Sequence, residues 1–473
     1  MQNYRYKTML PKRESKEHTY VQWMVAILAN STLLTYGLQS GWISPMTKVL
    51  QSDLSPVGRI SDNELSWVAS TMCLSAVFGV SIYAYIADTF GRRIGVVAIA
   101  VPQLCWIIKL CSTSTTGLII ARICCGIPAG GCFNLIPMYV KEISQDNIRG
   151  LLGSLLILMQ NIGILAMYAM GSYLEYTTVL WIVVGIPICT AVMMLKAPES
   201  PAFLVKVGKV EVNGSFKLEA TATIAFLRGL NVSDKSVLNE VSYMSNDDLY
   251  YKSIPEISFV TILKNKAWRR AFVLIISITS IGSFNGNLAI LTYASTILAS
   301  SGVTFSPELQ TLSFPAVLIL GSFLSMCCVE RIGRKLILAI SFLVSTVSLV
   351  CLATTQLLQN QSISMPGWLP VVAIVMSLCA YSAGVSPIPY IMMSEMFNFQ
   401  IRAKAIGFIV TYCWLMSFFQ LAAFGTISAA IGAHGAFFGF AIMNLLGALI
   451  TALALPETRG KTIDQIEVEL RGK

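Results

Sequence analysis

The most telling shortage in this sequence is the shortage of charge. Only 12% of its 473 residues are Asp, Glu, Lys or Arg, whereas 55% are hydrophobic. Soluble domains carry about 25% charged residues, so this chain has too little charge to cover the surface of a soluble protein of its size. The composition therefore argues against an ordinary soluble protein and favours one that exposes much of its surface to lipid.

Groups that support catalysis or metal binding are also scarce. The chain has only two histidines, His18 and His434, and none of its 12 cysteines forms a metal-ligand spacing with either. The cysteines all fall in apolar stretches, where cysteine acts as a small apolar filler. The sequence also lacks a hydrolase triad, a glycine-rich phosphate loop and a pair of buried carboxylates. We therefore predict that the protein is not an enzyme and uses neither a cofactor nor a metal.

The excess of positive charge has a simpler explanation than nucleic-acid binding. The net charge is +9, but the lysines and arginines are spread over several separate segments between apolar stretches. If the N-terminus is cytoplasmic, most of the 33 cations lie on the cytoplasmic side, as the positive-inside rule requires. The charge pattern predicts a multi-pass protein of the plasma membrane with both termini cytoplasmic, a lipid bilayer around it and no nucleic-acid partner.

What the chain has in place of charge is a succession of apolar stretches. Each is long enough to cross about 30 Å of hydrocarbon, which takes about 20 helical residues. We predict twelve transmembrane helices, at about 22–46, 65–87, 94–112, 117–140, 151–172, 178–196, 270–293, 308–329, 335–357, 368–393, 404–428 and 434–455. The first 20 residues are polar and basic without a small-residue cleavage site, so we expect the first stretch to be a retained helix.

The predicted fold class is an all-α membrane protein with two pseudo-repeated six-helix bundles. We expect a cytoplasmic tail at 1–21, the first bundle at 22–196, a cytoplasmic linker with short helices at 197–268, the second bundle at 269–455 and a tail at 456–473. Two local patterns support this division. Ser61 and Glu64 fit a capping box that opens the second helix, and Gly126 with Gly130 allows close helix contact. We expect the monomer to be the functional unit.

Short charged sequence motifs occur twice in the same order, each time at the ends of predicted helices. The residues of the first copy are Asp88, Gly91, Arg92, Arg93, Glu142, Arg149 and Glu199. Those of the second copy are Glu330, Gly333, Arg334, Lys335, Glu395, Arg402 and Glu457. The spacing between matching members is nearly constant. Such a repeat indicates a duplicated bundle, and two similar halves with a site between them are the architecture of a solute carrier.

We interpret the repeated charges as a gate at the cytoplasmic face. A glycine between an acid and two bases makes a tight turn, from which the bases can reach carboxylates at neighbouring helix ends. Exposed ion pairs are individually weak, about 0–1 kcal/mol, which suits a latch that closes in one conformation and opens in another. Plain positive-inside anchoring with incidental counter-charges is the alternative, and the sequence leaves it open.

The sequence resembles the sugar-porter family of the major facilitator superfamily, the group that contains the GLUT hexose carriers, over nearly the whole chain. Besides the charged repeats, the resemblance rests on Arg122-x-x-x-Gly126-x-x-x-Gly130-Gly131, Tyr139-Val-Lys-Glu142, Pro198-Glu-Ser-Pro201, Pro387-Ile-Pro389 and Pro456-Glu-Thr-Arg-Gly-Lys461. Gly41-Trp42-Ile-Ser-Pro45 and Ser66-Trp67-Val-Ala-Ser70 are similar to the insect facilitated trehalose transporter branch. The resemblance implies a major facilitator fold, alternating access and a small-molecule substrate such as a sugar.

The resemblance also places a substrate site, and several of its usual residues are changed here. The family's helix-seven glutamine pair is Gly282-Ser283, its asparagine is Leu288, and its tyrosine, a gating residue, is Tyr293. In helix ten the family's tryptophan is Tyr390 and a preceding glutamate is Ser382, while in helix eleven the asparagine is Cys413, beside Trp414. Gln160 and Asn161 follow the helix-five position, which is Ile157. Either the ligand is less polar than usual or the site is rebuilt.

The rebuilt site would lie at the midplane between the halves. Its candidate substrate-binding residues are Ser283, Asn285, Asn287, Tyr390, Gln160, Trp414 and Ser382. Amides are costly in lipid unless they face protein or a wet cavity, and in a regular helix Ser283 and Asn287 share a face. Tyr390 can stack on a sugar ring while forming one hydrogen bond. Ordinary helix-packing polarity is the alternative explanation for each of these polar residues.

The sequence favours a uniporter. Proton-coupled members of the family carry an aspartate in helix one, and that position here is Gln39. A carboxylate embedded at the midplane is the usual proton site of symporters, and we predict none. Arg122 is expected to be the only embedded charge. Three functions remain open: facilitated diffusion of a hexose or trehalose, carriage of another neutral and less hydroxylated solute, and sensing without transport.

One modification site is also predicted. Asn360, in the sequon Asn360-Gln-Ser362, lies in the outer loop between helices nine and ten. It is the sequon whose predicted position is topologically available for glycosylation. An unused sequon is the alternative.

Overall fold

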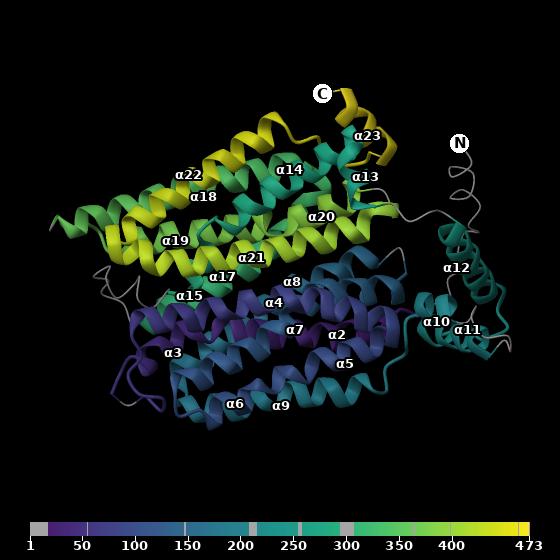
Figure 1. Cartoon of the computed structure of the whole chain (residues 1–473), viewed down its shortest axis with the longest axis horizontal. Helices are drawn as coiled ribbons and strands as arrows, with labels where there is room; N and C mark the ends of the chain where they lie inside the picture. Colours follow the sequence, from purple (N-terminus) through teal and green to yellow (C-terminus); the bar gives the residue numbers. More distant parts are fainter. Residues whose placement is uncertain are drawn as a thin grey trace.

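The computed structural model describes residues 18–53, 55–145, 148–207, 215–253, 258–293, 307–361, 363, 365–397, 399–461 and 463–472. Two helical bundles lie side by side along their length (Figure 1). The described residues contain twelve helices long and apolar enough to cross a membrane. This confirms the predicted all-α, twelve-helix fold class.

The N half is the first bundle, coloured purple to blue in Figure 1. Its helices are α2 (Tyr20–Gly41), α3 (Ile43–Leu50), α4 (Asp62–Phe90), α5 (Arg92–Ala100), α6 (Trp106–Cys111), α7 (Thr115–Ile143), α8 (Arg149–Tyr173) and α9 (Tyr176–Met194). A short 3-10 turn, Pro102–Cys105, joins α5 to α6 within one span.

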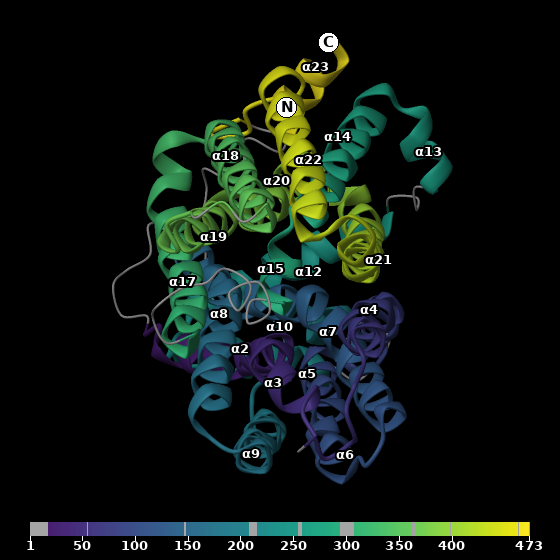
Figure 2. The same ribbon diagram turned by 90° about the vertical axis from the view of Figure 1, so that its left-hand side faces the viewer.

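The C half is the second bundle, coloured teal to yellow. Its helices are α14 (Lys266–Ser283), α15 (Asn287–Thr292), α17 (Pro307–Ile332), α18 (Arg334–Asn360), α19 (Trp368–Ala380), α20 (Pro387–Met396), α21 (Phe399–Ile431) and α22 (Ala433–Leu453). A π-helical segment, Tyr381–Val385, joins α19 to α20. Seen along the bundle axes, α17 and α21 lie towards the N half (Figure 2).

Short helices outside the spans gather at one end of the bundles (Figure 1). They are α10 (Pro201–Val207), α11 (Ser215–Arg228), α12 (Lys235–Ser253), α13 (Phe259–Lys264) and α23 (Ile463–Gly472). We call this end the linker end, and the opposite end, where α3 and the start of α4 lie, the distal end. The linker end also carries both copies of the repeated charges.

Local sequence sets the helix starts and the closest helix contacts. Ser61 Oγ accepts from the Glu64 amide, and the Glu64 carboxylate accepts from the Ser61 amide at 2.9 Å, so the predicted capping box is confirmed. A Cβ atom at Gly126 or Gly130 would lie 2.2 Å from a backbone oxygen of α4. Those glycines therefore let α7 pack against α4 at backbone distance.

Helix seven departs from the regular helix expected over 270–293. It ends as α14 at Ser283 and resumes as α15 at Asn287, with Gly286 at φ +95° between them. An added Cβ at Gly286 would lie 2.7 Å from the Phe440 ring, so glycine is required there for two independent reasons. The expectation that Ser283 and Asn287 share one face of a regular helix is therefore wrong.

Candidate functional site

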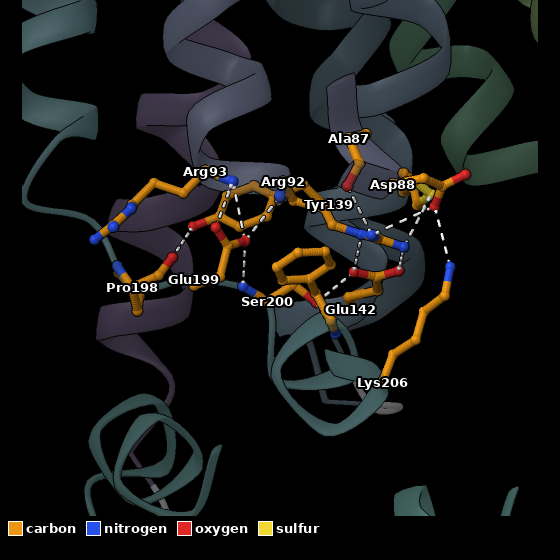
Figure 3. Close-up of polar contacts among 12 residues, drawn as sticks. Ala87, Asp88, Arg92, Arg93, Tyr139, Glu142, Pro198, Glu199, Ser200 and Lys206 are labelled. Atoms are coloured by element: carbon orange, nitrogen blue, oxygen red, sulfur yellow. Dashed lines mark hydrogen bonds and ion pairs between the residues drawn. The ribbon is translucent and has the colours of Figure 1, made fainter. Parts of the chain in front are cut away.

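Arg92, itself buried, is the centre of a charge cluster at the linker end of the N half (Figure 3). Its Nε donates to Glu142 at 3.1 Å, its second amino group to the other Glu142 oxygen at 3.3 Å, and its first to Ala87 O at 2.9 Å. Asp88 lies 3.6 Å from the same guanidinium and 3.4 Å from Lys206. Arg92 is thus held by α4 and α7 at once, in the two-oxygen geometry that carboxylates favour with arginine.

Glu199 binds backbone amides rather than a cationic side chain. One of its oxygens accepts from the amides of Arg92 and Arg93, at 2.8 and 3.0 Å, at the start of α5. Those are among the amides that a helix start leaves without partners. Gly91, at φ +101°, permits this approach, because a Cβ there would lie 2.4 Å from Glu199 Oε2. The carboxylate therefore anchors the chain after α9 to the start of α5.

The C half repeats this arrangement residue by residue. Arg334 donates to Glu395 at 2.9 Å, and Glu457 accepts from the amides of Arg334 and Lys335, each at 3.0 Å. Gly333, at φ +107°, stands where Gly91 stands, with a Cβ position 2.6 Å from Glu457. Two clusters with matching donors and acceptors follow from the duplicated sequence.

Each cluster lies within its own half. The described contacts of Arg92, Glu142 and Glu199 stay in the N half and the segment that follows it, and those of Arg334, Glu395 and Glu457 stay in the C half. Arg402 donates to Phe397 O at 3.2 Å, also within the C half. The side chains of Arg149 and Glu330 lie outside the described residues. In the contacts described, the charged gating candidates therefore form two matched clusters, and each cluster holds together helices of one half.

Aromatic rings from both halves meet between the bundles. Tyr36 of α2 packs edge-on against Trp414 of α21 at 6.0 Å, and Phe133 of α7 stacks on Tyr390 of α20 at 6.4 Å. Phe133 also contacts Tyr36 and Trp414, at 5.3 and 5.8 Å. Tyr390 is 38% exposed although it sits in a membrane span. The sequence analysis named Tyr390 and Trp414 but missed Tyr36 and Phe133.

The helix-seven asparagines are engaged in the packing of the C half. Asn285 and Asn287 are each 1% exposed. Asn285 donates to Asn444 Oδ1 at 2.7 Å, and Asn444 donates back to Asn285 O at 3.0 Å. Asn287 Oδ1 accepts from Ser377 at 3.2 Å. The structure therefore places Asn285 against α22 and Asn287 against α19.

The break in helix seven is braced by a buried side chain that the sequence analysis did not identify. Oriented to satisfy both neighbours, the Gln420 amide donates to Ser283 O at 2.7 Å and accepts from Gly286 N at 3.1 Å. Ser283 is half-buried and ends α14. The break is thus a hydrogen-bonded element of the interior, with α21 as its support.

A short polar chain joins the halves at α8 and α17. Asn161 donates to Ser322 Oγ at 2.9 Å, and Ser322 in turn lies 2.9 Å from Ser382 Oγ. Ser382 also donates to Leu318 O. Gln160, half-buried, neighbours this chain on α8. Ser322 was missed because a single serine in an apolar stretch carries no pattern.

The distal end holds two further hydrogen bonds between the halves. Tyr293 lies 3.2 Å from Ser66 Oγ of α4, and Tyr168 of α8 donates to Leu291 O of α15. Tyr293 also stacks on Phe424 at 5.1 Å. These contacts close α15 against the N half at the distal end.

Besides Arg92 at the linker end, the described residues of the N half include two further buried cations, Arg122 and Lys109. Arg122 donates to Val68 O at 2.9 Å and to Gln39 O at 2.8 Å. Lys109, 1% exposed, donates to Gln39 Oε1 at 2.7 Å and lies 4.0 Å from the ring centroids of Trp42 and Trp106. The expectation that Arg122 is the only embedded charge is therefore wrong. Lysine in a predicted helix end is ordinarily taken as exposed, and only the tertiary fold supplies the two rings that enclose it.

Asn360 is exposed at the end of α18. Ser362, the third residue of its sequon, lies outside the described residues.

Two known proteins with similar sequences are trehalose transporters by name. The chain is 27% identical over 459 residues to the facilitated trehalose transporter Tret1 of Anopheles gambiae, covering 96% of this chain and 57% of that protein. It is 26% identical over 456 residues to the Tret1 of Bombyx mori, covering 95% of this chain and 87% of that protein. The chain therefore spans little more than half of the first relative and most of the second.

Solved structures of xylose transporters share the fold. The inward open conformation of XylE from E. coli matches with a TM-score of 0.76 at 20% identity, covering 95% of this chain and 99% of that one. The proton:xylose symporter XylE bound to 6-bromo-6-deoxy-D-glucose matches with a TM-score of 0.74, also at 20% identity. The predicted major facilitator fold is confirmed.

The sequence model of the family described as Sugar (and other) transporter matches residues 25–470. Because that match covers nearly the whole chain, the protein belongs to the Sugar (and other) transporter family.

Proposed function

We propose that this protein is a facilitative carrier that moves a small neutral sugar, such as a hexose or trehalose, across the plasma membrane by alternating access. The observation that carries the proposal is the aromatic cluster of Tyr36, Phe133, Tyr390 and Trp414, which draws its rings from both halves. Flat rings bind the apolar faces of sugars. The family membership and the trehalose transporters among the relatives support the same substrate class.

The two halves, 22–196 and 269–455, are proposed to rock against each other around this cluster. The linker end would be cytoplasmic, because most of the lysines and arginines lie there. The distal hydrogen bonds of Tyr293 and Tyr168 then correspond to a closed outer side. In this state the clusters of Arg92 and Arg334 hold each half together, and they would bear on the opposite half when the inner side closes.

The carrier is proposed to be a monomeric uniporter. In helix one, Gln39 stands where symporters carry an aspartate, and its oxygen is occupied by the Lys109 ammonium. An amide cannot take up and release a proton near neutral pH. Substrate would therefore move down its own gradient without a coupled proton.

A second candidate substrate is a neutral solute with fewer hydroxyl groups. Asn285 is buried and bonded to Asn444, and the Asn287 oxygen accepts from Ser377, so only the Asn287 nitrogen of these two amides has no described partner and could bind a sugar hydroxyl. An unpaired buried hydroxyl would weaken binding by about 1–3 kcal/mol. A solute with one apolar ring face and few hydroxyls would avoid that loss.

Uptake into proteoliposomes separates these functions. We would measure entry of labelled trehalose, glucose and a panel of polyols and deoxy sugars, with Tyr390→Ala as the binding-site variant. A sugar carrier transports trehalose or glucose, and Tyr390→Ala lowers uptake about tenfold, the equivalent of ~1.4 kcal/mol. Phe408→Ala, at an exposed position of α21 away from the aromatic cluster, is the matched control. Uptake of deoxy sugars alone would favour the second candidate, and no uptake of any solute would favour a sensor.

A further inference from the structure

The short helix α13 and the start of α14 form a basic surface at the edge of the C half. We call residues 258–270 the α13 surface. Figures 1 and 2 both place α13 at the periphery of the C half, near the linker end of α14. The cations of this surface are Lys264, Lys266, Arg269 and Arg270. The surface thus carries a concentrated positive charge where a membrane span begins.

Three of these four cations have backbone carbonyl partners, and none has a carboxylate partner among the described residues. Within the part of the chain that the structure describes, none of the four forms an ion pair. Their backbone partners are Arg471 O for Lys266 (3.0 Å), Leu263 O for Arg269 (3.1 Å) and Leu470 O for Arg270 (2.8 Å). A carbonyl oxygen positions a cation without neutralising it, so these bonds leave the positive charge of the surface in place.

One acid of the described residues contacts this surface. Glu467 of α23 accepts from Trp268 Nε1 at 2.7 Å and lies 3.7 Å from Arg471. Its carboxylate therefore fixes α23 against α14. Its single negative charge, shared with Arg471, leaves the four cations of the α13 surface in excess.

The apolar side chains of α13 are divided between its two faces. Ile262 is fully buried, and Phe259 packs on Phe272 and Phe408 at 5.3 Å each. Val260 and Leu263 are 58% and 40% exposed. Water does not favour such exposure, whereas a short helix with apolar side chains and adjacent cations lies stably in the lipid interface.

We propose that the α13 surface binds the headgroups of anionic phospholipids in the cytoplasmic leaflet and so anchors the N-terminal end of α14. Val260 and Leu263 enter the acyl boundary, and Lys264, Lys266 and Arg269 contact the phosphate and carboxylate groups. The cytoplasmic leaflet is negatively charged and attracts juxtamembrane cations. The location rests on the proposed orientation, but the lipid preference itself does not, because vesicles can carry anionic lipid in both leaflets.

The test is photocrosslinking in vesicles. The full chain is reconstituted in phosphatidylcholine with a trace of photoactivatable phosphatidylserine, and labelled peptides are identified by mass spectrometry. We expect label within residues 258–270, removed by excess unlabelled phosphatidylserine but not by excess phosphatidylcholine. The readout needs no transported substrate, so it stays valid if the proposed function fails.

Matched variants locate the charge. Lys264→Gln with Arg269→Gln should lower the labelling of this peptide at least about fivefold, the factor that a single cation contributes near an anionic surface. Lys196→Gln with Lys235→Gln removes two exposed cations elsewhere at the linker end and should leave it unchanged.

A second double variant gives an independent test if the first one misfolds. Val260→Ser with Leu263→Ser keeps the charges and should also reduce labelling, because the apolar contact is lost. Labelling that phosphatidylcholine competes equally, or that neither variant pair reduces, would overturn the proposal.

Discussion

Replacing Glu457 with glutamine should destabilise the C half measurably. One carboxylate oxygen accepts from the amides of Arg334, Thr458 and Arg459 at 2.9–3.0 Å, and the other from Lys335 at 3.0 Å. Glutamine keeps one acceptor, loses the other and turns an NH₂ group towards an amide donor. The lost charge-assisted bond is worth about 1.5–3 kcal/mol. Because Glu457 is only half-buried, we expect the lower part of that range.

The assay is thermal unfolding of the purified protein in detergent. For a bundle of this size, 1 kcal/mol shifts the midpoint by about 2–4 °C, so Glu457→Gln should lower it by about 3–8 °C. Glu199→Gln, at the equivalent N-half position, should lower it similarly. Glu469→Gln is the control, because Glu469 pairs with Lys461 in a partly exposed bridge worth about 0–1 kcal/mol. An unchanged midpoint for both Glu457→Gln and Glu199→Gln would refute the anchoring role.

The pH dependence of the Glu457→Gln effect is fixed in sign. Burial raises the pKa of the Glu457 carboxyl, but the amides of Arg459, Arg334, Lys335 and Thr458 together outweigh it and hold the pKa below its usual value. A carboxyl with a depressed folded pKa stabilises the fold above its unfolded pKa, about 4.3, and loses that effect as pH falls through the folded pKa. The gap between wild type and Glu457→Gln should therefore be constant from pH 8 to about 5 and shrink below about 4. A gap that widens in acid would contradict this reasoning.

Three further predictions concern the helix break, the coupling and the gate. Gly286→Ala should lower the unfolding midpoint, since αL geometry disfavours a Cβ by about 1–2 kcal/mol and the Phe440 ring must move; Gly185→Ala, with open space around it, is the control. Uptake should be insensitive to an imposed pH gradient, and protonophore-sensitive accumulation above equilibrium would show that uniport is wrong. Arg92→Ala should favour the inward-open state, because the inner clamp acts when the linker end is closed in the outward-open state. The readout is increased cysteine accessibility from the linker end, and an unaltered pattern in a well-folded variant would remove the gating role.

The fold was predictable because a transmembrane helix is a continuous stretch of apolar residues, which can be recognised in the sequence alone. A stretch of apolar residues long enough to span the hydrocarbon must satisfy its own backbone hydrogen bonds, and this leaves the helix as the solution. The repeated motifs of glycine, arginine and glutamate likewise predict two matching charge clusters from the sequence alone. The small residues Gly126 and Gly130 fixed the close contact of α4 and α7.

The candidate site was only partly predictable, because its chemistry depends on which helices meet. Asn285 and Asn287 look like binding amides in sequence, but the fold pairs them with Asn444 and Ser377. Tyr36 and Phe133 look like ordinary apolar residues, but the fold brings their rings to the interface between the halves.

The sequence by itself determined the twelve spans and the charged motifs, since each is formed by residues close together in the chain. The recurrence of those motifs determined the duplication. The tertiary structure alone decided which partners the buried polar groups have. It enclosed Lys109 between two tryptophan rings, broke helix seven at Gly286 and joined Asn161 to Ser322 across the halves. The physical reason is that a buried polar group must be satisfied by whatever packs against it, and in this protein those partners come from distant parts of the sequence.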